Sequence, residues 1–183
     1  MKYIIVDLEA TCWKSREGRK NEIIEIGAVC VDDNKEILGE FVQIVQPLLN
    51  PVLSEFCISL TTITQEMVDE GVDFKTALSQ FTEWINSYED DYLVCSWGHY
   101  DRVQFTNDCN LHNLSTDWLQ NHISLKHQYG KIKLLRRPVG MKVALKKEQI
   151  KLEGVHHRGI DDAKNITKIF IKYFDSWKPN ETK

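Results

Sequence analysis

The chain has 183 residues, of which 42% are apolar and 27% are charged, and its formal net charge at pH 7 is −4. This composition is ordinary for a single globular domain, and it lacks the broad positive charge of a general polyanion binder. The five cysteines include no C-x-x-C pair, which argues against a disulfide framework or a cysteine zinc site. No apolar run is long enough for a signal peptide or a membrane span, so we expect a cytoplasmic protein without membrane contact.

The hydrophobic pattern predicts one mixed α/β domain, with a strand hairpin first and alternating strands and helices after it. Strands are predicted at Tyr3–Glu9, Ile23–Val31, Ile37–Val45, Tyr92–Ser96 and Trp118–Ser124. Helices are predicted from a cap at Asp73 through Ile85, through Asp101 and Phe105, at Met141–Lys147 and at Ile160–Phe174, with a loop and a short helix at Leu60–Gly71. We expect a core from about residue 2 to residue 174 and a short tail at 175–183.

Carboxylates on the first predicted strand are the first indication of chemistry. Because side chains alternate along a strand, Asp7 and Glu9 in VDLEAT point to the same face. Burying both carboxylates on an apolar strand is costly without a counter-charge, which a Mg²⁺ or Mn²⁺ ion would supply. The alternative interpretation is that a bare D-x-E pattern occurs by chance. Asp101 in SWGHYD follows a strand end, where α/β proteins place active sites, although an acid there also stabilises a helix dipole.

The segment HHRGIDDAKN contains two equivalent spacings, because His156 and Asp161 are five positions apart and so are His157 and Asp162. Helical phase distinguishes the two acids, since Asp162 shares a face with the apolar residues of the helix and Asp161 lies on the polar side. We therefore predict Asp162 as the inward carboxylate. His157 would then lie beside it as a general base, and helical phase alone does not exclude His156.

Positive charge gathers between residues 126 and 151, where nine basic residues accompany a single acid, Glu148. The basic residues are Lys126, Lys131, Lys133, Arg136, Arg137, Lys142, Lys146, Lys147 and Lys151. Such a stretch is able to follow a phosphate backbone, and a solvated helix face with a loop is the alternative interpretation.

In their order along the chain, the motifs DLE, SWGHYD and His157-x-x-x-x-Asp162 resemble those of the DEDDh family of 3′-to-5′ exonucleases. The segments DLEATCW, NEIIEIGAV, FCISLTTITQEMVDEG and HHRGIDDAKNI are similar to the Eri-type branch, which includes the 3′ histone-mRNA exonuclease and bacterial proteins described as sporulation inhibitors. The resemblance implies an RNase H-like fold, in which helices flank a mixed five-stranded sheet made of an antiparallel hairpin and parallel strands. It covers nearly the whole chain and therefore predicts a single exonuclease domain over residues 1–183.

The resemblance also implies a site and a substrate. Two Mg²⁺ or Mn²⁺ ions would be held by Asp7, Glu9, Asp101 and Asp162, with His157 as the base. Backbone groups near Ala10 and Thr11 would position the 3′-hydroxyl, and Leu60 and Tyr100 would contact the terminal bases, with core packing as the alternative for both. The expected substrate is the 3′ end of a single-stranded nucleic acid, RNA before DNA, and the product is a nucleoside 5′-monophosphate. No protein partner is indicated.

One departure from the family and two alternative functions accompany this prediction. Thr62 stands where the family commonly has glycine, which puts the shape of the loop and the substrate preference in question. The first alternative function is a proofreading or oligonucleotide-trimming exonuclease of the same superfamily. The second is a catalytically silent nucleic-acid-binding adaptor, and retention of all four carboxylates and the histidine argues against it.

Overall fold

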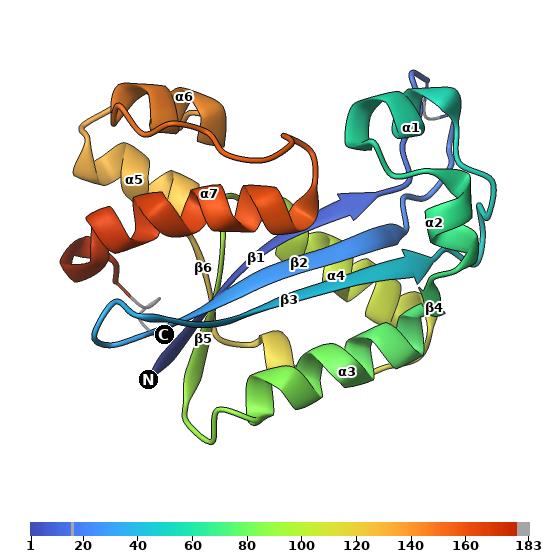
Figure 1. Ribbon diagram of the computed structural model, residues 1–183, viewed down its shortest axis with the longest axis horizontal. Helices are drawn as coiled ribbons and strands as arrows, with labels where there is room; N and C mark the ends of the chain where they lie inside the picture. Colours follow the sequence, from blue (N-terminus) through green and yellow to red (C-terminus); the bar gives the residue numbers. More distant parts are fainter. Residues whose placement is uncertain (16, 179–183) are drawn as a thin grey trace.

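A mixed sheet forms the centre of the computed structural model, which describes residues 1–15 and 17–178 (Figure 1). The strands are β1 (Lys2–Ala10), β2 (Ile23–Asp32), β3 (Ile37–Gln46), β4 (Val72–Asp73), β5 (Tyr92–Ser96) and β6 (His122–Ser124). Their order in the sheet is β4-β3-β2-β1-β5-β6. β1, β2 and β3 pair antiparallel, as the predicted hairpin requires, whereas β5 runs parallel to β1 and β6 parallel to β5.

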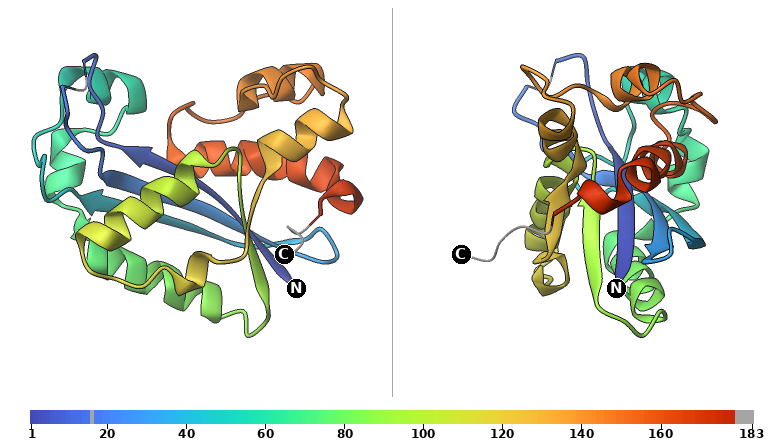
Figure 2. Two further views of the ribbon diagram at one scale, coloured as in Figure 1. Left: turned by 180° about the vertical axis from the view of Figure 1, so that it is seen from behind. Right: turned by 90° about the vertical axis from the view of Figure 1, so that its left-hand side faces the viewer.

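Helices cover both faces of this sheet, as the two views in Figure 2 show. The helices are α1 (Glu55–Thr61), α2 (Gln65–Asp69), α3 (Phe74–Asn86), α4 (Tyr100–Leu111), α5 (Leu125–Ile132), α6 (Met141–Lys147) and α7 (Gly159–Lys172). α3 and α4 bury one apolar core against the sheet, α5, α6 and α7 bury another on the opposite face, and α1 and α2 enclose a small third core. Within the described ranges, no helix has the length and apolar character needed to cross a bilayer.

The alternation of β1 decides which of its side chains reach which layer. Ile4, Val6 and Leu8 belong to the core under α3 and α4, whereas Ile5 belongs to the core under α7. Because Asp7 and Glu9 continue the series of Ile5, their side chains lie on the α7 side of the sheet. Both acids therefore face the helix that carries the last motif.

Several elements form as the sequence predicts. β5 and α6 begin and end at the predicted residues. Asp73 caps α3, since its Oδ1 accepts a hydrogen bond of 2.8 Å from the N–H of Thr76. The last helix ends at Lys172, before the predicted Phe174, because the chain turns there into a short 3₁₀ segment.

The prediction of five strands is corrected to six, because the two-residue strand β4 pairs with β3 at the edge of the sheet. Two residues are too few to show a period in the sequence. The predicted strand Trp118–Ser124 is extended only in its last three residues, since Asp117–Leu119 form a 3₁₀ turn. Of the predicted tail at 175–183, residues 179–183 lie outside the described part of the chain.

The sequence prediction missed α1 and α5. The signal for α1 was present, because the Oγ of Ser54 accepts a hydrogen bond of 3.0 Å from the N–H of Cys57, which is the usual role of serine before a helix. The preceding prolines, Pro47 and Pro51, suggested a longer irregular segment instead. α5 follows β6 with no loop between them, so no turn residues in the sequence mark the change from the strand pattern to the helix pattern.

Thr62 ends α1 in the left-handed backbone region, with a φ of 61°. Its N–H donates a hydrogen bond of 2.9 Å to the carbonyl of Ile58, which is how a glycine commonly closes a helix. A β-branched residue is strained in this conformation, whereas glycine adopts it freely. The loop after α1 therefore keeps a glycine-type turn in spite of the threonine.

Candidate metal centre

Three carboxylates from two distant parts of the chain meet at the end of β1. Asp7 and Glu9 come from the strand, and Asp162 comes from the first turn of α7. One oxygen of each lies within 4.8 Å of the others, so a single cation is able to contact all three. Glu9 and Asp162 are buried and Asp7 is half-buried. Residues of two of the three sequence motifs thus lie close together in space.

Burial and mutual repulsion make these acids hard to ionise without a cation. Burial, and then the charge of Asp101, raise the pKa of Asp7 well above its ordinary value. Burial and the charge of Asp162 raise the pKa of Glu9 to about 8. Buried acids with raised pKa values need a positive ion, and carboxylate oxygens suit hard divalent cations. The residues present therefore fit a divalent metal ion.

Asp101 lies beside this group and is tied to the same strand. It is the second residue of α4 and is 5% exposed. Its Oδ1 accepts a hydrogen bond of 3.2 Å from the N–H of Leu8, the residue between Asp7 and Glu9. Burial raises the pKa of Asp101 to about 6. Its contact with a cation, direct or through water, stays a prediction.

The raised pKa of Glu9 predicts how the stability of the metal-free protein depends on pH. The folded protein keeps this proton until about pH 8, whereas the unfolded chain releases it near pH 4.5. The folded state therefore binds more protons between these values, and its free energy of unfolding falls as the pH rises. From pH 6.5 to pH 8 in EDTA, we expect the free energy of unfolding of wild type to fall by about 1–2 kcal/mol relative to that of Glu9→Gln. Glu9→Gln is the reference because the contributions of the other titrating groups largely cancel in this comparison.

Urea unfolding at both pH values, with and without Mn²⁺, provides the measurement. Added Mn²⁺ should remove most of the loss, because the cation takes the place of the proton. If the stability of wild type in EDTA instead rises between pH 6.5 and pH 8 relative to Glu9→Gln, the pKa of Glu9 is not raised by burial and the neighbouring carboxylates.

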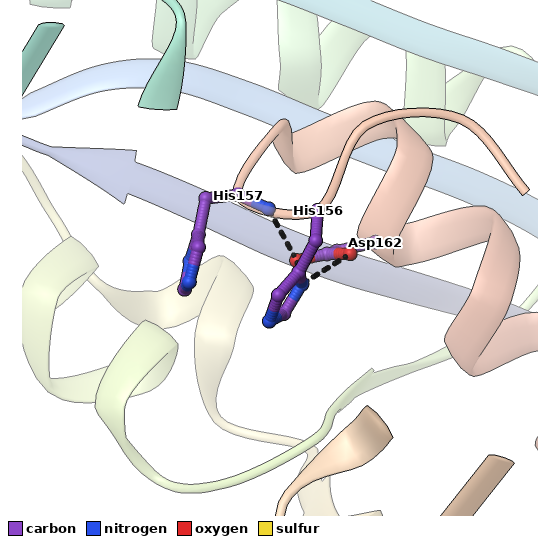
Figure 3. Close-up of side chains that lie close together, drawn as sticks. All are labelled: His156, His157 and Asp162. Atoms are coloured by element: carbon purple, nitrogen blue, oxygen red, sulfur yellow. Dashed lines mark hydrogen bonds and ion pairs between the residues drawn. The ribbon is translucent and has the colours of Figure 1, made fainter. Parts of the chain in front are cut away.

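The two histidines of the last motif take different positions around Asp162 (Figure 3). Nδ1 of His156 lies 2.8 Å from Oδ2 of Asp162, so this ring contacts the carboxylate directly. His157 reaches the same carboxylate through its backbone N–H, at 3.0 Å, and its ring stacks on that of His156 with the centroids 3.9 Å apart. Burial, and then the neighbouring His156, lower the pKa of His157, which keeps its imidazole neutral near pH 7.

The start of α7 turns Asp162 inward and Asp161 outward, as helical phase predicted. Asp162 is 4% exposed and joins the carboxylate group. Asp161 instead accepts a hydrogen bond of 2.7 Å from the N–H of Val155 and closes the loop before the helix. His157 has a φ of 68°, and this left-handed turn leads the chain into α7.

The sequence analysis missed two residues that join the halves of this centre, Glu25 on β2 and Arg158 before α7. Glu25 is fully buried and accepts hydrogen bonds from the guanidinium of Arg158 and from the N–H of Gly159. Strand alternation would have placed Glu25 on the α7 side with Gly27. Its partner, however, is 133 residues further along the chain, so the pairing leaves no local signal.

The residues predicted to contact the substrate lie on three elements. Ala10 and Thr11 follow Glu9, where the pairing of β1 with β2 changes register, and both are buried. Leu60, on α1, is half-buried, and Tyr100, at the start of α4, is 52% exposed. Burial nevertheless raises the pKa of the Tyr100 phenol, so the ring is partly enclosed. Contact of any of the four with a nucleotide stays a prediction.

Comparison with known proteins places this centre in a family. The family model described as "Exonuclease" (RNase_T) matches residues 4–170. ERI1 exoribonuclease 2 of Xenopus laevis is 36% identical over 188 residues, which cover 91% of this chain and 27% of that protein. 3′-5′ exoribonuclease 1 of Homo sapiens is 34% identical over 180 residues, which cover 92% of this chain and 51% of that protein. The chain thus spans about a quarter to a half of these curated relatives.

Among solved structures, the nuclease domain of 3′hExo, a DEDDh family member bound to rAMP, matches with a TM-score of 0.93 and 31% identity. The match covers 100% of this chain and 97% of that domain. The chain belongs to the DEDDh exonuclease family, whose members have RNase H-like folds and depend on divalent metal ions. Within it, the chain falls in the Eri and histone-mRNA exonuclease branch.

Proposed function

We propose that this protein is a 3′-to-5′ exonuclease that hydrolyses single-stranded RNA, and DNA as a second substrate, and releases nucleoside 5′-monophosphates. The observation that carries the proposal is the meeting of Asp7, Glu9 and Asp162 within 4.8 Å, with Asp101 bonded to the same strand. The relatives named exoribonucleases and the related domain bound to rAMP support RNA as the substrate.

In this proposal the four carboxylates hold two Mg²⁺ or Mn²⁺ ions. When bound, such ions activate water and stabilise charge on the attacking and leaving oxygens of the phosphodiester. His157, with a lowered pKa and no hydrogen bond from its ring to the described residues, accepts the proton of the attacking water. Ala10 and Thr11 position the 3′-hydroxyl through their backbone, and Tyr100 and Leu60 offer surfaces to the terminal bases.

The basic residues between 126 and 151 support a nucleic-acid substrate. Within the described ranges, Lys133 is the one member that forms an ion pair, with Glu148, which is buried and also pairs with Lys172. The remaining cations lie on or beside α5 and α6, and Lys142 is close enough to His157 to lower the pKa of that ring. A cation such as Lys142, which forms no ion pair within the described ranges and lies near His157, suits a phosphate of an incoming strand.

A panel of 5′-labelled oligonucleotides tests the substrate class. It comprises RNA and DNA strands of one sequence, the RNA duplex, and RNAs of two to five nucleotides, each with Mg²⁺, with Mn²⁺ and with EDTA. We expect stepwise shortening from the 3′ end, faster for the RNA strand than for the DNA strand, and none in EDTA. Activity confined to the shortest RNAs would indicate an oligonucleotide-trimming enzyme, and binding without turnover in either metal would indicate an adaptor.

A cytoplasmic location completes the proposal. All five cysteines are free thiols, which fits a reducing compartment. Imaging of the tagged full-length protein in its own cells would test the location.

A further inference from the structure

One buried carboxylate connects the two halves of the metal centre without belonging to it. Glu25 is 0% exposed and lies opposite Glu9 in the pairing of β1 with β2. Its Oε2 accepts a hydrogen bond of 2.8 Å from the N–H of Gly159, the first residue of α7. Its two oxygens also accept bonds of 3.1 Å each from Nε and Nη2 of Arg158. Glu25, on β2 next to the strand that carries Asp7 and Glu9, therefore links the sheet to the helix that carries Asp162.

The backbones of sheet and helix approach each other closely at this point. A Cβ on Gly27 would lie 2.1 Å from the carbonyl carbon of Gly159, and a Cβ on Gly159 would lie 2.9 Å from the carbonyl oxygen of Asp7. α7 contacts both β1 and β2, and in Figure 1 its first turn lies next to β1. The two glycines offer no side chains that could interlock, whereas further along the helix apolar residues such as Ala163 and Ile166 pack α7 into the core. At the first turn, the directional bonds of Glu25 restrain the orientation of the helix.

The chemistry of the pair also favours a positioning role. A buried ion pair adds little net stability, because the desolvation of both charges offsets their attraction, and an apolar pair of similar volume often serves as well. A guanidinium held by both carboxylate oxygens does fix orientation, since its donors have a rigid planar geometry. At this point orientation matters, because Asp162 and His157 lie within four residues of Arg158.

We propose that the Glu25–Arg158 pair is a positioning device that holds α7 in the register at which Asp162 meets Asp7 and Glu9, and so sets the metal affinity of the centre. Glu25 does not ligate the metal. This inference rests on the proposed metal-dependent function, and it concerns affinity for the ion rather than turnover.

Calorimetric titration with Mn²⁺ tests the pair in two variants, Glu25→Gln and Arg158→Lys. In the first variant the glutamine still accepts the bond from Gly159 but loses the charge pair. In the second the lysine keeps the charge but not the two-point geometry. We expect roughly tenfold weaker Mn²⁺ binding in each, at the lower end of the usual effect of residues that support metal ligands. Circular dichroism should show a folded protein in both cases.

Glu148→Gln is the matched control, because Glu148 is also a buried glutamate that holds α7, through Tyr173 and Lys172. It should lower the unfolding temperature and leave Mn²⁺ affinity unchanged. The inference is overturned if Arg158→Lys and Glu25→Gln both bind Mn²⁺ within twofold of wild type, or if Glu148→Gln weakens binding equally. Because binding is read without substrate, a wild type that binds Mn²⁺ but cleaves nothing would count against the proposed function alone.

Discussion

Replacement of Asp7 by alanine is expected to lower the rate of mononucleotide release from single-stranded RNA by about 10³-fold or more. Asp7 is one of the three clustered carboxylates, and among neighbouring charges that of Asp101 raises its pKa the most. Its loss removes a ligand whose ion contributes several kcal/mol to stabilising the transition state, and about 4 kcal/mol corresponds to about 10³ in rate. Single-turnover cleavage of a 5′-labelled strand in Mn²⁺ measures the effect.

The same variant separates lost chemistry from lost structure. Removal of one carboxylate relieves repulsion among buried acids, so Asp7→Ala in EDTA should be at least as stable as wild type. Mn²⁺ should no longer stabilise it. Asp33→Ala is the matched control, because Asp33 is an exposed acid at the far end of the β2–β3 hairpin, bonded to the chain terminus and Tyr3. Full activity in Asp7→Ala would refute the proposed centre.

Replacement of His157 by alanine is the second large effect, with an expected loss of roughly 10²–10⁴-fold in rate, the usual contribution of a general base. The base must be unprotonated to act. Because the pKa of His157 is lowered, the acid limb of the wild-type rate profile should lie below pH 6.5, and it should disappear in His157→Ala. Mn²⁺ affinity should change little, since the contact of this residue with Asp162 is made by its backbone.

His156→Ala is the matched comparison, because the two rings stack on each other and differ in their contacts. His156 holds the Asp162 carboxylate through Nδ1, so its loss should reduce activity less and keep the acid limb. If His156→Ala instead removes the limb while His157→Ala keeps it, the roles of the two histidines are reversed.

Much of this centre follows from periodicity alone. Strand alternation places Asp7 and Glu9 on one face of the sheet, and helical phase predicts that Asp162, not Asp161, points inward. In the structure, β1 has this alternation and Asp162 is buried. Both patterns depend on local geometry, which a short window of sequence contains. The long buried strands and α3 were predictable for the same reason.

The features that escaped prediction depend on contacts across the chain. The edge strand β4 exists because β3 offers it a partner, and two residues carry no pattern of their own. The link between Glu25 and Arg158 joins β2 to α7, so neither residue stands out before the fold is known. The difference between the histidines likewise arises from how the turn at His157 presents each ring to Asp162.

The most direct test of the central claim is a time course of one 5′-labelled single-stranded RNA with Mn²⁺, followed on a sequencing gel and by chromatography of the released nucleotides. The carboxylate centre predicts a ladder that shortens one nucleotide at a time from the 3′ end, release of nucleoside 5′-monophosphates, and complete arrest by EDTA. Internal cuts, immediate release of the labelled 5′ nucleotide, or undiminished cleavage in EDTA would contradict it.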